Sequence, residues 1–496
     1  MTASTTSDPR LDKPWAALWS LVIGFFMILV DSTIVTIAMP EIISGLGTDL
    51  NGGIWVTSAY LLAYVVPLLI TGRLGDRIGP KTMYLTGLAV FTASSLACGL
   101  APNLTVMIIA RVAQGLGAAC MTPQTMTAIT RMFPGARRGP AMAVWGATAG
   151  VAMLVGPILG GVLTDTLGWS WIFFINVPVG VAGFALVARN VPRFELHSHA
   201  FDLVGVGLSA VAMFLLVFGI QEGASFDWRW PVWTMIGAGL AMLTVFVWWQ
   251  FRTEEPLIPP ALFADRNFTL SNTAIACMGF AVTGMTLPFI LYLQLVRGLS
   301  PLRAALMLIP MAVASLIMAR PVGQLVGRVH PRWLASAGFV LTALGLVWFW
   351  AWLEPTRPLW MFLLPNFLVG FGSSLVWSPL ATSATFNLPM AWAGAGSGVY
   401  NTTRQVGSVL GSAGIAAIMV SRINAEFSGL THGAAPGGHA TTGPLPEFLH
   451  TAYTNAMATS MLLPTAALVL GGVISLGFEA LKPRHSPDPQ PAEQAS

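Results

Sequence analysis

Long apolar segments recur along the whole chain and are separated by short polar or charged stretches. A helix needs about 20 apolar residues to cross the hydrocarbon core of a bilayer, so such segments can be counted directly from the pattern. About fourteen are present, at roughly residues 15–38, 54–72, 82–101, 104–126, 141–164, 171–188, 203–220, 231–251, 270–296, 301–322, 333–353, 358–382, 397–420 and 456–480. The pattern predicts an all-α integral membrane protein with fourteen transmembrane helices.

Two short sequence patterns each occur twice at the same spacing. GRLGDRIGPK at residues 72–81 matches GQLVGRVHPR at residues 323–332, an offset of 251 residues (323 − 72). GPILG at 156–160 matches GSVLG at 407–411 with the same offset. Membrane transporters are often built from such repeats, with the substrate path between the halves. We therefore expect the first pattern to form a loop between two spans in each half.

The duplication divides the chain into two equivalent bundles, because six spans precede residue 190, six follow residue 268, and two lie between. We predict an N-terminal six-helix bundle over residues 1–195, a two-helix insert over 196–255 and a C-terminal six-helix bundle over 256–484. The proline-rich residues 485–496 are expected to form a disordered cytoplasmic tail.

Composition and charge agree with a membrane protein. Hydrophobic residues make up 55% of the chain and charged residues 9%, and the mean hydropathy of +0.72 excludes a soluble domain. Most of the 24 Lys and Arg residues fall on one side if the N-terminus is inside, and this bias predicts cytoplasmic termini in the cell membrane. The net charge of +4 thus reflects topology and indicates no nucleic-acid partner.

An energy source can be inferred by elimination. A phosphate-binding loop needs a Lys directly after a Gly, whereas Lys13, Lys81 and Lys482 follow Asp, Pro and Leu. ATP is therefore not expected as a partner. The cysteines and histidines lack metal-ligand spacing, so no metal or organic cofactor is expected, and an ion gradient remains, with protons as the coupling ion.

Two embedded charges are candidates for proton coupling. Asp31 lies about 24 Å along its helix from Trp15, hence toward the outer part of the bilayer. Arg111 lies about 10 Å from the outer start of the fourth span, so the two residues are at a similar depth. An embedded charge normally has a partner or faces a watery cavity. We expect Asp31 and Arg111 to interact during proton coupling, and a permanent structural salt bridge is the alternative.

The motifs resemble those of the major facilitator superfamily, and specifically its fourteen-helix drug/proton antiporter branch, over nearly the whole chain. Residues 72–81 resemble the superfamily signature between helices two and three, with Pro80 where a basic residue is more usual. The motifs of helices one, four, five and six are similar to residues 29–40, 111–119, 150–161 and 169–180. The resemblance implies alternating access between two six-helix bundles.

The resemblance also implies roles for particular residues. Asp31 and Arg111 are the proton-coupling pair. The conformational latch comprises Gly72, Asp76, Arg77, Gly79, Lys81 and Arg404, with Asp76 at the start of the thirteenth span, near residues 395–398, where a carboxylate suits a helix N-terminus. The antiporter helix carries Gly150, Gly156, Pro157, Gly160 and Gly161. With Gly146, these glycines follow at intervals of four, six, four and one, and four-residue spacing puts glycines on one stripe of a helix that can pack closely on another. Ordinary tight packing is an equally open interpretation.

The substrate site is less constrained by the sequence. Arg404 has three open interpretations: it reaches the cytoplasm, meets Asp76, or serves an anionic substrate. No Asp or Glu falls inside spans nine to thirteen, which favours a neutral, amphipathic or singly charged substrate. The cavity candidates are Tyr60, Tyr64, Gln114, Met153, Met285, Phe289, Tyr292, Gln294 and Asn401, and core packing is an equally open interpretation for each.

The sequence therefore predicts a proton-coupled antiporter that exports lipophilic or amphipathic small molecules and functions as a monomer in the bilayer. It is not expected to be an enzyme. A dedicated exporter of an endogenous lipid, siderophore or antibiotic is an alternative within transport. A non-transporting sensor or scaffold is the alternative of another class, and the presence of Asp31, Arg111 and Asp76 argues against it.

Overall fold

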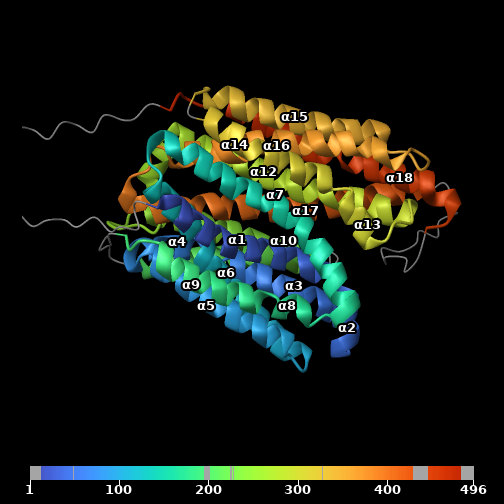
Figure 1. The fold of residues 1–496 in the computed structure, drawn as a ribbon, viewed down its shortest axis with the longest axis horizontal. Coiled ribbons are helices and arrows are strands. Elements are labelled where there is room, and N and C mark those ends of the chain that lie inside the picture. Colours follow the sequence, from blue (N-terminus) through green and yellow to red (C-terminus); the bar gives the residue numbers. More distant parts are fainter. Residues whose placement is uncertain are drawn as a thin grey trace, which may run out of the picture.

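The computed structural model describes residues 13–48, 50–194, 202–223, 226, 228–326, 328–427 and 445–481, without the side chains of residues 50, 51, 136, 153 and 301. The described chain is built from helices and contains no strand (Figure 1). Lys482 and the predicted tail at 485–496 lie outside the described residues. The predicted all-α membrane fold is confirmed.

Most of the N-terminal half forms the lower layer in Figure 1, and its helix α7 (Arg138–Leu167) runs against the upper layer. It comprises α1 (Pro14–Ile37), α2 (Met39–Leu46), α3 (Leu50–Val65), α4 (Leu68–Ile78), α5 (Pro80–Gly99), α6 (Leu104–Met132), α7 (Arg138–Leu167), α8 (Trp171–Phe174) and α9 (Asn176–Asn190). The insert comprises α10 (Leu203–Gln221) and α11 (Trp230–Gln250), which pack on each other, while α10 also contacts α3 and α17.

The C-terminal half forms the upper layer in Figure 1. It comprises α12 (Arg266–Leu291), α13 (Pro301–Leu306), α14 (Ile309–Leu325), α15 (Pro331–Trp352), α16 (Leu363–Thr385), α17 (Ala393–Phe427), α18 (His450–Ser460) and α19 (Leu462–Ser475). Two long helices join the halves, because α7 packs on α14 and α16 of the C-terminal half, and α17 packs on α4 and α6 of the N-terminal half.

Thirteen helices of the described chain are long and apolar enough to span a membrane, and a bent pair makes a fourteenth. The bent pair is Gly52–Val65 and Leu68–Ile78, with a bend of 46°. Pro67 lies in the break, where its missing N–H and its ring disfavour a continuous helix. The predicted number of spans is therefore reached only if this broken helix counts as one.

Several sequence-based boundaries were wrong; for example, α17 extends to Phe427 beyond the predicted residue 420. The pattern at residues 72–81 is not a ten-residue loop, because α4 continues to Ile78 and α5 begins at Pro80. Only Gly79 separates the two helices, and its φ of +94° is a conformation that residues with a Cβ rarely adopt. The last span begins at Glu447 rather than at residue 456. Polar residues at these helix ends concealed the extra turns.

One end of the bundle is used as a reference below. The basic end is defined by Gly79 between α4 and α5 and by the 3₁₀ turn Gly135–Arg137 between α6 and α7. It is the end that the charge pattern predicts to be cytoplasmic. The opposite end is where α1 ends at Ile37.

Candidate transport site

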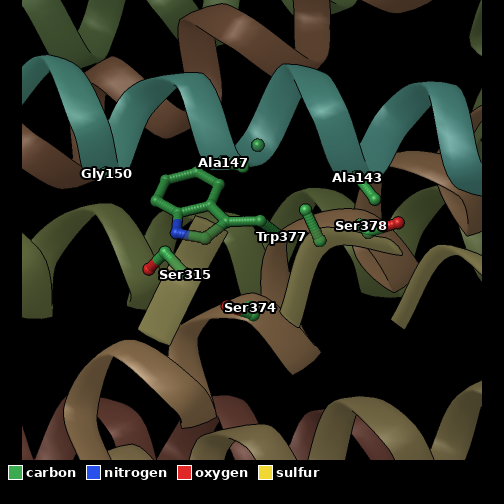
Figure 2. A pocket seen from close by; sticks show the side chains of 9 residues that line it. Ala143, Ala147, Gly150, Ser315, Ser374, Trp377 and Ser378 are labelled. Atoms are coloured by element: carbon green, nitrogen blue, oxygen red, sulfur yellow. The ribbon is translucent and has the colours of Figure 1, made fainter. Parts of the chain in front are cut away.

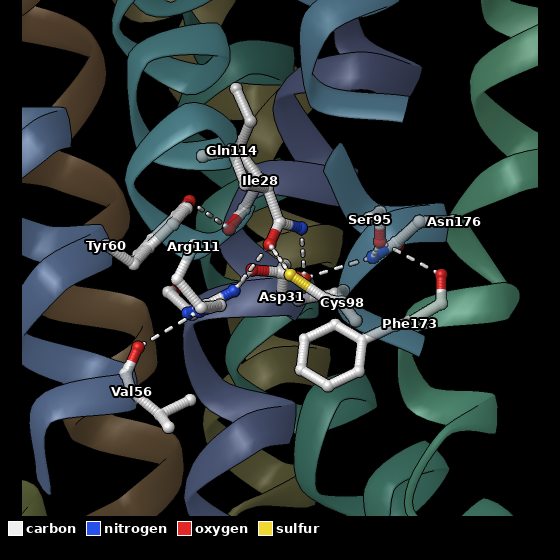
Figure 3. A network of polar contacts seen from close by, with 12 residues as sticks. Ile28, Asp31, Val56, Tyr60, Ser95, Cys98, Arg111, Gln114, Phe173 and Asn176 are labelled. Atoms are coloured by element: carbon white, nitrogen blue, oxygen red, sulfur yellow. Dashed lines mark hydrogen bonds and ion pairs between the residues drawn. The ribbon is translucent and has the colours of Figure 1, made fainter. Parts of the chain in front are cut away.

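Asp31 lies at the centre of a buried polar network between α1, α6 and α9 (Figure 3). Its Oδ2 accepts a hydrogen bond from the Arg111 guanidinium at 2.7 Å. Its Oδ1 accepts from Gln114 Nε2 at 2.8 Å and from Asn176 Nδ2 at 3.0 Å. The predicted proximity of Asp31 and Arg111 is present in the structure, and two amides complete the coordination of the carboxylate.

The groups around this carboxylate are themselves held in place. Arg111 donates through Nε to the Val56 carbonyl at 3.1 Å, and its guanidinium lies 4.1 Å from the centre of the Tyr60 ring. Asn176 also donates to Ser95 Oγ at 3.0 Å. Asp31 and Arg111 have no exposed surface. A proton can therefore reach Asp31 only after some of these contacts open.

Helix α7, the predicted antiporter helix, packs directly against the segment of α1 that carries Asp31. A Cβ added to Gly156 would lie 1.9 Å from Thr33 Oγ1, and one added to Gly160 would lie 3.0 Å from the Ile34 side chain. These two glycines therefore allow the backbones of α7 and α1 to approach closely beside Asp31. Pro157 follows Gly156 within the helix and is half-buried.

The glycine pairs of α7 lie on two different faces of the helix. A Cβ on Gly146 would meet the Trp377 side chain at 3.0 Å, and one on Gly150 would meet the Ser315 side chain at 3.1 Å, so both face the C-terminal half. The step of six residues from Gly150 to Gly156 rotates the side-chain direction by about 240° beyond a full turn, at 3.6 residues per turn. One face of α7 therefore packs on the partner half and another on α1, while a Cβ on Gly161 would meet nothing within 4 Å.

A small cavity lies where α7 meets α14 and α16 (Figure 2). It has a volume of about 20 Å³, and its lining includes Gly150, Ser315 and Trp377. A cavity of this size holds about one water molecule. The halves are therefore closely packed on this side, and a substrate would have to separate them to enter.

Asp76 joins the two halves at the basic end. Its carboxylate accepts from the backbone N–H of Gly394 at 2.8 Å and of Ala395 at 3.0 Å, in the first turn of α17. Arg131 of α6 donates to the same carboxylate at 3.1 Å. The structure thus has the predicted placement of Asp76 at this helix N-terminus. We call Asp76, Arg131, Gly394 and Ala395 the latch.

Close backbone contacts accompany the latch in both halves. A Cβ on Gly72 would lie 2.5 Å from the Gly394 carbonyl oxygen, and one on its duplicate Gly323 would lie 2.6 Å from Pro140 Cα. Arg138 donates to the Thr385 carbonyl across the same end. The basic end is therefore closed by two related contacts between the halves.

The other predicted latch residues act elsewhere. Lys81 donates to the carbonyls of Ala188 at 2.8 Å and Val191 at 2.6 Å and so caps the C-terminal end of α9. Arg77 has an exposed side chain. Arg404 is not part of the latch, because it lies ten residues after Gly394, about 15 Å along α17, and Asp76 pairs with Arg131 instead.

Arg404 does not reach the cytoplasmic surface either. Its side chain is 5% exposed, and the guanidinium lies 5.9 Å from the centre of the Trp145 ring of α7. Its Nε and an Nη atom have no hydrogen-bond partner among the described residues. Of the three interpretations of Arg404, two are thereby contradicted and the one that involves an anion remains.

The structure does not bring the nine cavity candidates together. Tyr60 and Gln114 belong to the Asp31 network, and Tyr64 lies beside Tyr60 with its hydroxyl 3.1 Å from Thr122 Oγ1. Asn401 of α17 approaches Met126 of α6 at 3.9 Å across the interface of the halves. Met285, Phe289, Tyr292 and Gln294 lie in the C-terminal half, the first three buried and Gln294 half-buried, and the Met153 side chain is outside the described residues.

Several functional candidates were missed in the sequence. Arg131 and Arg138 were counted only as topological charges, although both contact the other half. Glu222, at the end of α10, is 2% exposed and accepts from Ser58 Oγ at 2.6 Å. Asn176 lay within a recognised motif, but no spacing along the chain indicated that it would reach Asp31. In the part of the chain that the structure describes, no three His, Cys, Asp or Glu residues gather as a metal site.

Comparison with known proteins identifies the family. The model of the Major Facilitator Superfamily matches residues 21–202 and 181–412. The chain belongs to the major facilitator superfamily. This membership makes it a multi-pass membrane transporter rather than an enzyme, and it confirms the resemblance seen in the motifs.

Individual relatives agree with this membership. An uncharacterized MFS-type transporter of Mycobacterium tuberculosis is 49% identical over 467 residues, which cover 94% of this chain and 81% of the relative. A tetracenomycin C resistance and export protein of Streptomyces glaucescens is 30% identical, covering 99% and 97% of the two chains. A solved proton:xylose symporter superposes with a TM-score of 0.61 at 12% identity, covering 92% and 95%, which shows the shared fold.

Proposed function

We propose that this transporter is a proton-coupled antiporter that exports lipophilic or amphipathic small molecules. The observation that carries the proposal is the fully buried Asp31 carboxylate, which is held by Arg111, Gln114 and Asn176 beside the antiporter helix. Support for export comes from relatives named as export or resistance proteins, such as the Streptomyces protein. Protons are the coupling ion, and neither ATP nor a bound cofactor takes part.

The proposed coupling step is the titration of Asp31. Protonation removes the negative charge that balances Arg111, and an uncompensated buried charge costs about 3–5 kcal/mol. The network must then rearrange or admit water. Since Thr33, two residues from Asp31, contacts Gly156, the rearrangement would change how α1 packs on α7. Because α7 also faces the C-terminal half, the proton would thereby alter the contact between the halves.

The proposed transport cycle is alternating access between the two six-helix bundles. With the latch formed, the predicted cytoplasmic end is closed, which corresponds to a state that receives protons from the outside. Deprotonation and release of the latch would open the basic end for substrate. The insert α10–α11 lies at the side of this pathway, against α3 and α17, and we propose that each single chain transports as a monomer.

The decisive experiment measures whether the movement of substrate drives the movement of protons. The protein is reconstituted in proteoliposomes, and export substrates are selected by comparing drug and metabolite accumulation in cells with and without the protein. Addition of a substrate should release protons in wild type and not in Asp31→Asn. Proton release that is unchanged in the variant would contradict the coupling proposal.

The same accumulation profile separates the alternatives within transport. A dedicated antibiotic, lipid or siderophore exporter would change the level of one compound class, whereas a multidrug exporter would lower several unrelated classes. The printed function of the Streptomyces relative makes an antibiotic the first dedicated substrate to examine. No change for any compound would favour the sensor or scaffold.

A further inference from the structure

Arg404 is a buried cation without an acidic partner among the described residues. Its side chain is 5% exposed, and its Nε and one Nη have no hydrogen-bond partner among the described residues. In contrast, Arg111 has Asp31 at 2.7 Å and Arg131 has Asp76 at 3.1 Å. Isolated buried charges are costly, so such a group normally has a counter-ion in at least one state of the protein.

Other unpaired donors lie around Arg404. Tyr400 precedes it by one helical turn, so both side chains share a face of α17, and the Tyr400 hydroxyl has no hydrogen-bond partner among the described atoms. Trp145 Nε1 likewise has none. The Trp145 ring lies 5.9 Å from the Arg404 guanidinium and 6.4 Å from the Tyr400 ring. Three buried side chains with unpaired donor groups therefore lie in one cluster, and the described residues supply no hydrogen-bond partner for these donors.

The cluster also contains stacked aromatic rings. Phe25 of α1 stacks on Trp145 with the ring centres 5.2 Å apart and an angle of 20°. Both side chains are 1% exposed. Aromatic rings of a ligand pack well on such rings. A cation clustered with a hydroxyl donor, an indole donor and aromatic rings matches a molecule that has one acidic group on an aromatic body.

We propose that Arg404, Tyr400 and Trp145 bind the acidic group of an amphipathic aromatic monoanion. The site deepens the proposed export function and rests on it. Arg404 supplies charge-assisted hydrogen bonds, Tyr400 and Trp145 supply further donors, and Phe25 contacts the rings. Because these residues come from α1, α7 and α17, the site is shared between the two halves.

The position of the cluster is consistent with entry of the substrate from the basic end. Arg404 lies about 15 Å along α17 from the latch residue Gly394, and Trp145 lies about 10 Å along α7 from Arg138. With the latch closed, these side chains have at most 5% exposure. Opening the latch would separate α4 and α6 from α17 and expose the cluster to the cytoplasm.

The test compares two probes of nearly equal shape, 2-naphthoate and its uncharged amide, 2-naphthamide. Binding to purified full-length protein in nanodiscs is measured by equilibrium dialysis. Wild type should bind the carboxylate about tenfold or more tightly than the amide, as expected for a charge-assisted hydrogen bond worth roughly 1.5–3 kcal/mol. Arg404→Gln should abolish this difference, and Arg404→Lys should retain part of it.

A surface arginine provides the matched control. Arg266, whose side chain is 61% exposed, is replaced by Gln, and this variant should bind both probes as wild type does. Equal affinity of wild type for the two probes would overturn the proposal. An equal loss of affinity for both probes in Arg404→Gln would also overturn it, because Arg404 would then have a structural role only.

The outcome can be separated from that of the proposed function. Proton release driven by an uncharged substrate, together with no preference for naphthoate, would contradict the anion site and leave proton-coupled export intact. Naphthoate binding that depends on Arg404, together with no coupled proton movement, would support the site and contradict the antiporter.

Discussion

The two halves of the molecule share their packing and differ in their buried charges. In the N-terminal half, a Cβ on Gly87 would lie 2.7 Å from the Gly117 carbonyl oxygen. In the C-terminal half, a Cβ on Gly338 would lie 2.7 Å from the Gly372 carbonyl oxygen. The same close helix contact has therefore been retained after duplication.

These contacts identify equivalent positions in the halves. Arg111 lies six residues before Gly117, as Asn366 lies six residues before Gly372. A Cβ on Gly156 would approach the Val30 carbonyl, and one on its duplicate Gly407 would approach the Ala276 carbonyl. Asp31 follows Val30 as Cys277 follows Ala276.

The charged pair of one half is thus replaced by neutral side chains in the other. Asn366 donates to the Phe362 carbonyl of its own helix at 3.0 Å and has no charge to balance. The glycine contacts serve helix packing and occur in both halves. The buried ion pair occurs in one half only, so the proposed proton coupling would belong to the N-terminal half.

The largest expected effect comes from removing the charge of Asp31. Asp31→Asn should reduce substrate-driven proton release to the level of empty liposomes, because Asn keeps the side-chain volume and an acceptor for Arg111 but does not titrate. The matched variant in the other half, Cys277→Ser, should retain most of the release. A similar loss in both variants would contradict the assignment of coupling to the N-terminal half.

The second effect tests the close contact of α7 with α1. Gly156→Leu should impair transport far more than substrate binding, because a Cβ there would already lie 1.9 Å from Thr33 Oγ1. Gly160→Leu should act in the same direction. Gly161→Leu is the control, since a Cβ at Gly161 would meet no atom within 4 Å. Transport rates and substrate affinity are measured in parallel, and normal transport by Gly156→Leu would contradict the contact.

The third effect concerns the latch. A carboxylate at a helix N-terminus contributes about 0.3–1 kcal/mol when exposed and up to about 2 kcal/mol when partly buried. Asp76→Asn should therefore shift a balanced equilibrium toward the inward-open state by a few-fold to about thirtyfold. Turnover should slow, while cysteines introduced on the basic side of the interface should label as fast as before or faster.

This labelling requires a background without Cys98, Cys120 and Cys277. Cys98 donates to Gln114 Oε1 at 3.6 Å, so serine is the appropriate replacement there. Asp165→Asn, an exposed acid at the other end of α7, serves as the control. Faster labelling from the opposite end in Asp76→Asn would show that Asp76 does not hold the basic end closed. The duplicate of Asp76, Gly327, lies outside the described residues.

The smallest effect tests how the insert attaches to the N-terminal half. Ser58→Ala removes the hydroxyl that donates to the buried Glu222 carboxylate at 2.6 Å. An unsatisfied buried polar group costs about 1–3 kcal/mol, so the thermal midpoint should fall. Combining it with Glu222→Gln should recover part of the loss, because a neutral amide is less costly to bury. An unchanged midpoint in Ser58→Ala would argue against this contact as an attachment of α10.

The sequence by itself determined the membrane class, the duplication and the depth of the main charges. Span length is set by bilayer thickness, and helical rise fixes how far a residue lies along its span. This is why Asp31 and Arg111 could be placed at one depth, whereas the placement of Asp76 at the start of α17 came from the family resemblance. The family motifs added the antiporter resemblance.

Only the tertiary structure decided which side chains meet. The rotation of each helix about its own axis depends on packing, so the sequence did not show that Gly146 and Gly156 face different helices. Nor did it show that Arg131, rather than Arg404, contacts Asp76. A buried charge is stabilised by donors that converge from several helices. Their convergence on Asp31, and the absence of an acid at Arg404 among the described residues, follow from the assembled bundle.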